Sequence, residues 1–412
     1  MINYKRKVLD NGLTVIVHED HSTPLATINI LYKVGARDES PDKTGFAHLF
    51  EHLMFGGSVN IPSYDTPLQL AGGDNNAFTS NDITNYYLTL PSDNIDTGFW
   101  LESDRMLSLA FTEESLEVQR SVVIEEFKQR YLNQPYGDVW LLLRPLVYKV
   151  HPYKWATIGK EISHIENATL DDVKDFFYRF YAPDNAILVV AGNVKAEEMF
   201  NKAQEWFGSI SRSAATRVPY PVEPPQTEKR VLTVERDVPF NSLYRAYHSS
   251  ARTDDEYYAE DLLTDILNQG KSSRMYLSLV KEKKIFSEIH TYVSGSHDKG
   301  ILVIEGKLLK GKTMEEADKA IDEELQKVIN ESVTEFELEK VKNKLESRKE
   351  FGDMDLGDRA LNLASAEWLG DISLVNSTLE KYRNVSAGDI QKRAAQIFRE
   401  ENCSVLYYMS KN

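Results

Sequence analysis

The chain has 412 residues, of which 42% are hydrophobic and 27% are charged, and its formal net charge is −16. This length exceeds what one hydrophobic core usually organises, so two or more domains are expected. The negative charge disfavours nucleic acids and acidic lipid surfaces as partners. No apolar run reaches the ~18 residues that a membrane-spanning helix requires. The single cysteine, Cys403, excludes an intrachain disulfide and argues against a cysteine-based metal or redox site.

The first half of the chain begins with predicted strands. Residues 7–9 and 13–17 flank Asp10-Asn11-Gly12, a strong turn signal, and so predict a β-hairpin that is followed by a strand over 26–34. The N-terminal residues carry positive charge with no apolar block behind them, so no secretory signal is expected. A cytoplasmic location is therefore predicted, and a periplasmic one would require that a leader had been removed.

Two helices follow in this half, with a strand between them. Apolar residues at helical spacing predict a helix over about 44–55, which Gly56-Gly57 would end. Residues 76–90 are rich in Thr, Tyr and Phe and predict strand. The second helix is expected over about 112–132, with Thr112 as its N-cap and two acidic residues in its first turn.

A proline-rich segment divides the chain into two similar parts. Four prolines between residues 219 and 225 predict a linker over 216–228, between domains at 1–215 and 229–412. The segment that begins at Asn167 resembles the one that begins at Asn384, and the strands that follow them repeat the same offset of 217 residues. Two similar α/β halves, related by internal duplication, are the natural interpretation.

The central motif is His48-Leu49-Phe50-Glu51-His52, inside the first predicted helix. Histidines at i and i+4 share one face of a helix, so their imidazoles can converge on a single metal ion. Glu51 lies beside that face and can reach a metal-bound water as a general base. This order, H-x-x-E-H, is the reverse of the commoner H-E-x-x-H.

A third protein ligand is needed, because a catalytic zinc typically takes three ligands and a water. The best candidate is Glu126, 74 residues after His52, on the second predicted helix. Glu125 competes with it, and composition alone does not decide between adjacent carboxylates. The alternatives to a catalytic metal are a polar surface helix and a purely structural metal, for which the glutamate inside the motif would be unnecessary.

These residues resemble the pitrilysin/insulinase-like family of zinc peptidases, which includes mitochondrial processing peptidase. The resemblance spans nearly the whole chain, and the segments that carry it are 45–57, 76–87, 122–126, 181–185 and 272–276. It implies an α+β fold of two homologous halves, each a mixed, mainly antiparallel sheet packed with helices. Only the N-terminal half would carry the metal motif.

The resemblance also implies a site and a reaction. In the family pattern the third ligand is the second glutamate of the pair, which favours Glu126 over Glu125. The cofactor is then zinc, with Glu51 as the catalytic base of a metalloendopeptidase. The family binds peptides as an added strand near the metal, and the matching segment here begins at Asn76-Ala77.

Two departures from the family pattern bear on activity. Seven residues before Glu126, where the family usually has a glutamate near the zinc site, this chain has Gln119. In the second half, Val280 and Ser287 stand where active relatives carry an arginine and a tyrosine that bind substrate and stabilise the oxyanion. Some bacterial relatives divide these duties between two chains. We therefore expect a metal-bearing subunit that requires a homologous partner supplying the Arg/Tyr pair.

Two alternatives stay open for the whole protein. A homodimeric peptidase would work without the Arg/Tyr pair. A catalytically silent assembly subunit of a larger complex would share the fold, although such subunits usually have degraded metal motifs and the motif here is intact.

Overall fold

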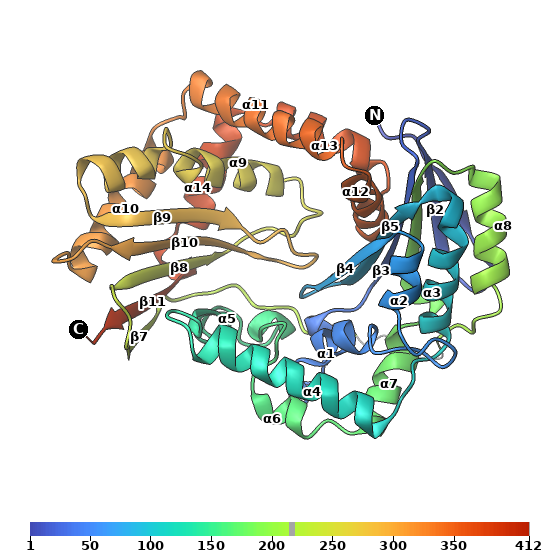
Figure 1. Cartoon of the computed structure of the whole chain (residues 1–412). Helices are drawn as coiled ribbons and strands as arrows, with labels where there is room; N and C mark the ends of the chain where they lie inside the picture. The colour runs from blue at the N-terminus through green and yellow to red at the C-terminus, as the bar shows by residue number, and fades with distance from the viewer. Residues whose placement is uncertain (214–218, 412) are drawn as a thin grey trace. The chain divides into compact units, whose positions relative to one another are not determined.

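The computed structural model describes residues 1–213 and 219–411, which form two compact units. Unit 1 comprises residues 1–130, 155–220 and 350–376, and unit 2 comprises 131–154, 221–349 and 377–412. Each unit is a sheet packed with helices, so the α+β prediction is confirmed (Figure 1). No described helix combines the length and apolar character needed to cross a bilayer.

Unit 1 contains a six-stranded sheet in the order β1-β2-β6-β3-β5-β4 among the described residues. Strands β2 and β6 are parallel, and the other pairs are antiparallel. Its strands are β1 (Lys5–Val8), β2 (Thr14–Glu19), β3 (Leu25–Tyr32), β4 (Asp74–Thr79), β5 (Thr84–Pro91) and β6 (Ala186–Gly192). Its helices are α1 (Phe46–Leu53), α2 (Asp65–Leu70), α3 (Ile95–Leu107), α4 (Glu113–Phe127), α6 (Ile162–Glu166), α7 (Leu170–Phe180), α8 (Ala196–Phe207) and α12 (Leu356–Trp368).

Unit 2 contains a five-stranded sheet in the order β7-β11-β8-β10-β9 among the described residues. Again one pair, β7 with β11, is parallel, and the rest are antiparallel. Its strands are β7 (Arg230–Arg236), β8 (Ser242–His248), β9 (Phe286–Val293), β10 (Ile301–Leu308) and β11 (Cys403–Ser410). Its helices are α5 (Val139–Val147), α9 (Tyr257–Asn268), α10 (Met314–Asn330), α11 (Glu335–Gly352), α13 (Leu374–Asn384) and α14 (Ala387–Ile397).

The two sheets share one topology. Strands β2, β6, β3, β5 and β4 correspond in order and direction to β7, β11, β8, β10 and β9, and β1 is an addition to unit 1. The repeated segments found in the sequence begin equivalent helices, α7 and α14. Thr169 and Ser386 cap these helices, and each accepts a hydrogen bond from the third helical amide. Because strand order, direction and capping all repeat, the structure supports the duplication.

Each half of the sequence contributes one helix to the unit formed mainly by the other half. Helix α5 of the first half belongs to unit 2, and α12 of the second half belongs to unit 1. Helix α5 contacts β11, β7 and β8, whereas α12 contacts β6, β3 and β2, which are the equivalent strands. Buried Ala360, Leu363 and Ala364 of α12 pack against apolar residues of the unit 1 sheet. The compact units therefore differ from the contiguous domains 1–215 and 229–412, because each half contributes one helix to the core of the other unit.

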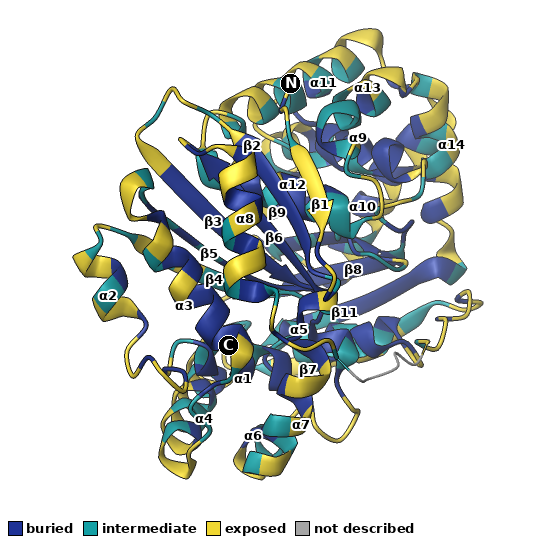
Figure 2. Ribbon diagram, turned by 90° about the vertical axis from the view of Figure 1, so that its right-hand side faces the viewer, coloured by how far each residue is buried: buried dark blue, intermediate teal, exposed yellow. Residues whose placement is uncertain are grey.

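Several predicted boundaries need correction. The region 76–90 forms two strands, β4 and β5, because Ser80 donates its amide to the Ile83 carbonyl at 2.8 Å and closes a turn between them. The second long helix is α-helical only to Phe127 and continues as a π-helix over Lys128–Leu132. The predicted hairpin is confirmed, with Val8 paired to Thr14 (Figure 2 shows β1 exposed along its length).

The predicted linker is only partly visible. Residues 214–218 lie outside the described part of the chain, and they include 216–218 of the linker and the end of the predicted first domain. Residues 219–228 contain no helix or strand. The Glu223 carboxylate accepts hydrogen bonds from the amides of Lys149, Val150 and His151 at 2.8–2.9 Å, which attaches the linker to the segment after α5.

Candidate metal centre

Helix α1 is short and buried, and it carries the H-x-x-E-H motif. Phe46, Leu49 and Phe50 are at most 2% exposed, so the apolar side of the helix is fixed in the core. Its N-cap residue, Gly45, has φ of 90° and offers no capping side chain. Buried Glu39 instead accepts hydrogen bonds from the Gly45 and Ala47 amides, both at 2.9 Å. A carboxylate from the preceding loop thus satisfies the first turn of this helix.

A second buried carboxylate holds the segment that follows α1. Asp104 of α3 accepts hydrogen bonds from the Ser58 hydroxyl and from the Asn60 side chain, the latter at 2.6 Å. The Tyr86 hydroxyl donates to the Phe50 carbonyl at 3.2 Å. The eight-residue helix is therefore fixed at both ends and from the sheet side, which limits the freedom of its histidines.

Helix α4 supplies the third side chain of the cluster. Thr112 caps it as predicted, and Val123 and Phe127 bury its inner face. Val122, on the same helix, is exposed. Glu126 turns toward α1, whereas Glu125 is exposed and pairs with Lys128 at 2.6 Å. Because 100° separates consecutive helical residues, only one of the two glutamates faces the histidines.

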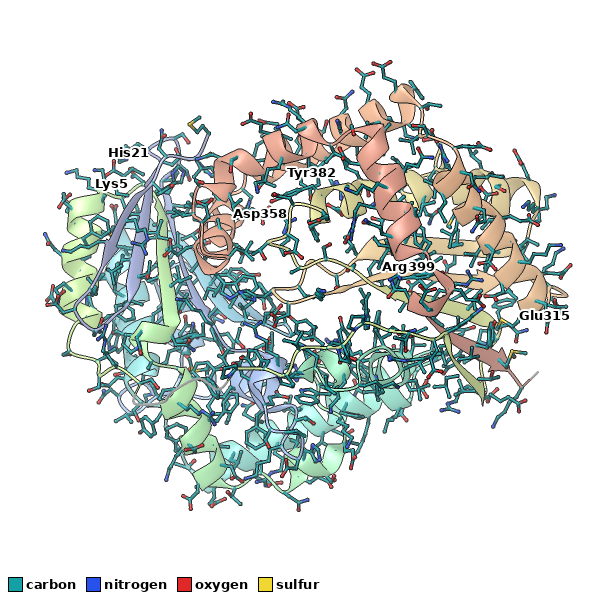
Figure 3. All side chains as sticks on the ribbon, turned by 180° about the vertical axis from the view of Figure 1, so that it is seen from behind. Lys5, His21, Glu315, Asp358, Tyr382 and Arg399 are labelled. Carbon is teal, nitrogen blue, oxygen red and sulfur yellow. The ribbon has the colours of Figure 1, made fainter. Side chains whose placement is uncertain are left out.

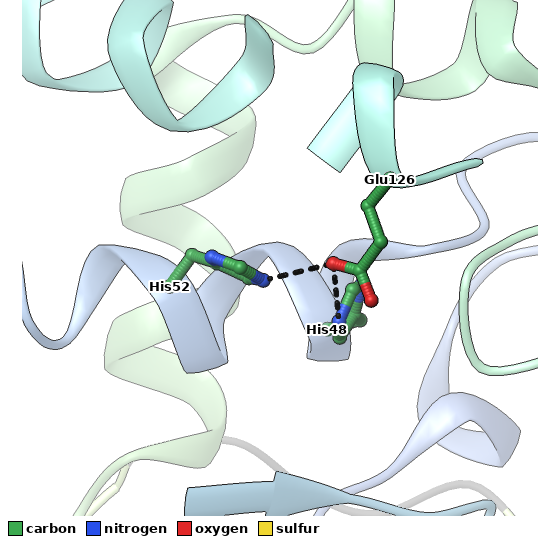
Figure 4. Close-up of side chains that lie close together, drawn as sticks. All are labelled: His48, His52 and Glu126. Carbon is green, nitrogen blue, oxygen red and sulfur yellow. Dashed lines mark ion pairs between the residues drawn. The ribbon is translucent and has the colours of Figure 1, made fainter. Parts of the chain in front are cut away.

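The two histidines and Glu126 converge (Figure 4). Glu126 Oε2 lies 3.5 Å from His48 Nε2 and 3.4 Å from His52 Nε2. Of the described residues, these three form the one group whose candidate ligand atoms lie within 4.8 Å of one another. The separations exceed the 2.7–3.2 Å of ordinary N–H···O hydrogen bonds. They match the edge of a tetrahedron around zinc, roughly 3.4 Å for bonds of about 2.0–2.1 Å.

The electrostatics of this cluster suit a cation. Burial lowers the pKa of His48 to about 4, so its imidazole is neutral and its lone pair is available at neutral pH. The adjacent His52 lowers the pKa of Glu126, which keeps the carboxylate ionised. Two imidazoles and one carboxylate are a donor set that zinc prefers, so the residues present fit the metal.

Glu51 lies on the same helix but outside the three-atom cluster. Thr79 of β4 donates a hydrogen bond from its hydroxyl to Glu51 Oε2 at 2.7 Å. Burial raises the pKa of Glu51, and the Thr79 hydrogen bond partly offsets this effect. Thr79 is a residue that sequence reasoning passed over within the segment 76–87. Successive side chains of a strand point to opposite faces of the sheet, and this alternation next to the motif helix could have identified Thr79.

The other predicted residues lie near α1 but outside the cluster. Asn76 and Ala77 are on β4, the edge strand of the sheet, and α1 contacts this strand. Gln119 lies on α4 beside Gly56, after the end of α1, and its amide nitrogen is 3.8 Å from the position of a Cβ on that glycine. The substrate-binding role of Asn76 and Ala77 and the supporting role of Gln119 stay predictions.

Val280 and Ser287 belong to unit 2. Val280 is partly buried in a π-helix, Tyr276–Glu282, and packs against the apolar core of that unit. Ser287, on β9, donates its hydroxyl to the Lys307 carbonyl at 3.1 Å. Both side chains thus have structural contacts of their own.

Two family profiles match the chain. Residues 14–137 match the profile described as insulinase (peptidase family M16). Residues 167–345 match the profile described as the peptidase M16 inactive domain. The chain belongs to the insulinase family, peptidase family M16. The range of the inactive-domain profile excludes His48, Glu51, His52 and Glu126, so that description concerns the part of the chain without the motif.

Family M16 relatives align along the chain. The zinc protease PqqE of Helicobacter pylori is 29% identical over 97% of this chain and 91% of its own length. The mitochondrial-processing peptidase subunit beta of Saccharomyces cerevisiae is 28% identical over 64% of this chain and 56% of its own length. A crystal structure of a protease from Helicobacter pylori superposes with a TM-score of 0.94 at 28% identity, covering 99% of this chain and all of that one. The predicted family and its zinc cofactor are thereby confirmed at family level.

Proposed function

We propose that this protein is a zinc-dependent endopeptidase that hydrolyses peptides or unfolded polypeptides. The observation that carries the proposal is the convergence of His48 and His52 of α1 with Glu126 of α4, beside Glu51 of α1. These three residues would hold the metal. Zinc bound there supplies a Lewis acid and a water of lowered pKa. Two M16 relatives whose names describe peptidases support the reaction class.

In this proposal Glu51 is the catalytic base. It accepts a proton from the water that attacks the scissile carbonyl, and it returns the proton to the amine as the C–N bond breaks. Its raised pKa makes it a better proton acceptor than an ordinary glutamate, and the Thr79 hydroxyl orients its carboxylate toward the helix face that carries the histidines. Exposed Asn76 and neighbouring Ala77 on the edge strand β4 would pair with an extended peptide through the backbone.

A homologous partner subunit is the second element of the proposal. Val280 has no cationic group and Ser287 has no phenolic hydroxyl, the groups that active relatives use at these positions. An oxyanion donor is typically worth about 10²–10³ in rate. A heterodimer with a chain that carries the Arg/Tyr pair would restore them. The relative from Saccharomyces cerevisiae is itself named as a subunit, which agrees with this arrangement.

The test compares the zinc-loaded chain with two matched variants on a quenched fluorescent peptide library. Glu51→Gln removes the base and keeps the size of the side chain, so zinc should stay bound while cleavage falls by about 10²–10⁴-fold. Glu125→Gln makes the same change one residue before Glu126, on an exposed side chain, and should leave cleavage unchanged. Cleavage that survives Glu51→Gln would refute the assigned base.

The same experiment separates the partner models. Robust cleavage by the lone chain would favour a homodimeric or monomeric peptidase that needs no Arg/Tyr subunit. If the lone chain binds zinc but does not cleave peptides, the next step is a search for a homologous chain that restores cleavage. The absence of any such chain would favour the silent assembly subunit. The cytoplasmic location stays a prediction that cell fractionation tests.

A further inference from the structure

Two adjacent glutamates of α4 each pair with a cation on the next turn, yet their surroundings differ. Glu125 Oε1 lies 2.6 Å from Lys128 Nζ, and Glu126 Oε1 lies 2.8 Å from Arg130 Nη1. The Glu125 side chain is 60% exposed, whereas the Glu126 side chain is 17% exposed. Only Glu126 directs its second oxygen, Oε2, toward both histidines of the described cluster. Its two oxygens therefore face different groups.

The local backbone brings Arg130 to this carboxylate. The α-helix ends at Phe127, and the chain continues as a π-helix over Lys128–Leu132. The ion pair spans this change of helix type, because Glu126 belongs to the α-helix and Arg130 to the π-helix. The Arg130 side chain is 70% exposed and reaches Glu126 from the solvent side, so the pair forms with little cost of burying the guanidinium. A single turn of π-helix is often found at functional sites.

We propose that Arg130 is a positioning residue that keeps Glu126 a one-oxygen ligand of the metal. A carboxylate can bind a metal through one oxygen or through both, and a catalytic zinc needs one coordination position free for water or substrate. Arg130 holds Oε1, which leaves Oε2 alone to face His48 and His52. The planar guanidinium carries several donors in a fixed geometry that suits a carboxylate oxygen. The inference rests on the proposed metal site.

The competing explanation is an ordinary surface ion pair. Exposed ion pairs on helices contribute little to stability, and many have no measurable effect when removed. Lys128 forms an exposed i,i+3 pair with Glu125 nearby, and this pair provides the control. If Arg130 acts as proposed, then its removal has opposite effects on metal affinity and on catalysis. A merely structural role would lower both together.

The test uses the full chain with Arg130→Met, Arg130→Lys and the control Lys128→Met. Metal-free protein is titrated with Co²⁺ to record its visible absorption, zinc affinity is measured by competition with a chelator, and peptide hydrolysis is followed. In Arg130→Met the second carboxylate oxygen is free to bind and a repelling charge is gone. We expect a weaker Co²⁺ band, typical of a higher coordination number, and zinc affinity raised roughly three- to tenfold. Hydrolysis should fall at least roughly tenfold, and Arg130→Lys should recover part of the band.

Each outcome decides between the explanations. An Arg130→Met protein whose Co²⁺ spectrum and zinc affinity equal those of Lys128→Met would overturn the inference. So would parallel losses of zinc affinity, activity and unfolding temperature, which would indicate a structural role. Because spectrum and affinity are independent of turnover, they decide the question even if the lone chain does not cleave peptides. Wild-type protein that binds neither metal would instead refute the proposed function, and this inference with it.

Discussion

The two halves of the molecule place different chemistry on helices that occupy the same place in the topology. In unit 1, His52 of α1 faces Glu126 of α4 at 3.4 Å. In unit 2, α9 follows β8 as α1 follows β3, and α11 is the second helix after β10 as α4 is the second α-helix after β5. There Asp265 of α9 pairs with Arg348 of α11 at 3.0 Å. The corresponding helices thus bring together candidate metal ligands in one half and an ion pair in the other.

In each unit a threonine of the edge strand also donates a hydrogen bond to the first of these helices. Thr79 of β4 donates to the Glu51 side chain, whereas Thr291 of β9 donates to the backbone carbonyl of Thr264 at 2.7 Å. In unit 2 the Tyr382 hydroxyl donates to Asp261 at 2.5 Å (Figure 3 labels Tyr382). The duplicated frame therefore does not itself require a metal, and a few side chains decide whether the pair of helices binds one.

The largest expected effect comes from placing the unit 2 pair in unit 1. His52→Asp combined with Glu126→Arg should replace two metal donors by an ion pair, because the helices that carry them are equivalent. Zinc affinity should fall by more than about a thousandfold, since most of the donor set is lost. Metal analysis after dialysis measures the loss, and circular dichroism verifies the fold. Retained stoichiometric zinc would show that other residues hold the metal.

Buried carboxylates that accept hydrogen bonds from backbone amides form the next difference between the halves. In unit 1, Glu39 reaches from a loop to the first amides of α1, whereas in unit 2 buried Glu260 of α9 accepts a hydrogen bond from the Ser250 amide at 2.9 Å. Glu39→Ala should destabilise the protein by about 1–3 kcal/mol, because two buried amides lose their acceptor. Chemical denaturation of the metal-free protein measures the change, and Glu39→Gln, which keeps one acceptor, should cost less. Equal stability of Glu39→Ala and wild type would contradict the capping role.

The pH dependence of stability tests the burial of His48 in unit 1. The pKa of His48 in the folded state is about 4, below the ordinary value of 6.5, because burial disfavours the imidazolium. The unfolded chain therefore binds more protons between pH 4 and 6.5, so stability falls as the pH drops through this window. For the metal-free protein this contribution is about 1–2 kcal/mol between pH 7 and 5, and His48→Gln should remove it. An unchanged pH slope in the variant would exclude His48 as the source.

The smallest effect is expected for the ion pair of unit 2. The Arg348 side chain is 55% exposed, and exposed pairs contribute at most about 1 kcal/mol. Arg348→Met should therefore lower the free energy of unfolding by less than this amount and leave zinc binding and hydrolysis unchanged. Thermal unfolding and zinc titration test both statements. A loss of zinc affinity would mean that the two sites are coupled.

Local patterns in the sequence predicted most of the frame. Turn residues, helical spacing and the N-cap residue Thr112 act through residues nearby in the chain, so the hairpin, α1 and α4 could be inferred. The two similar segments indicated the duplication. The H-x-x-E-H spacing predicted the paired imidazoles for the same reason. The choice of Glu126 over Glu125 needed the family resemblance, and the structure brings Glu126 to the histidines.

Contacts between distant segments could not be predicted in this way. Glu39, Thr79 and Asp104 support the motif helix through hydrogen bonds that depend on the tertiary fold. The exchange of α5 and α12 has no local signal, because an amphipathic helix packs equally well on either of two similar sheets. The π-helix after Phe127 was likewise not visible in a periodic pattern of apolar residues.

The reciprocal placement of α5 and α12 has a consequence for dissection of the gene. A cut at the proline-rich segment yields two fragments, each of which carries a helix that belongs to the other fragment's core. The first fragment would expose Ile16, Leu31 and Val189, which α12 covers in the intact chain. Neither fragment is a self-sufficient folding unit, so separately expressed pieces should aggregate alone and recover a folded, zinc-binding protein only when produced together.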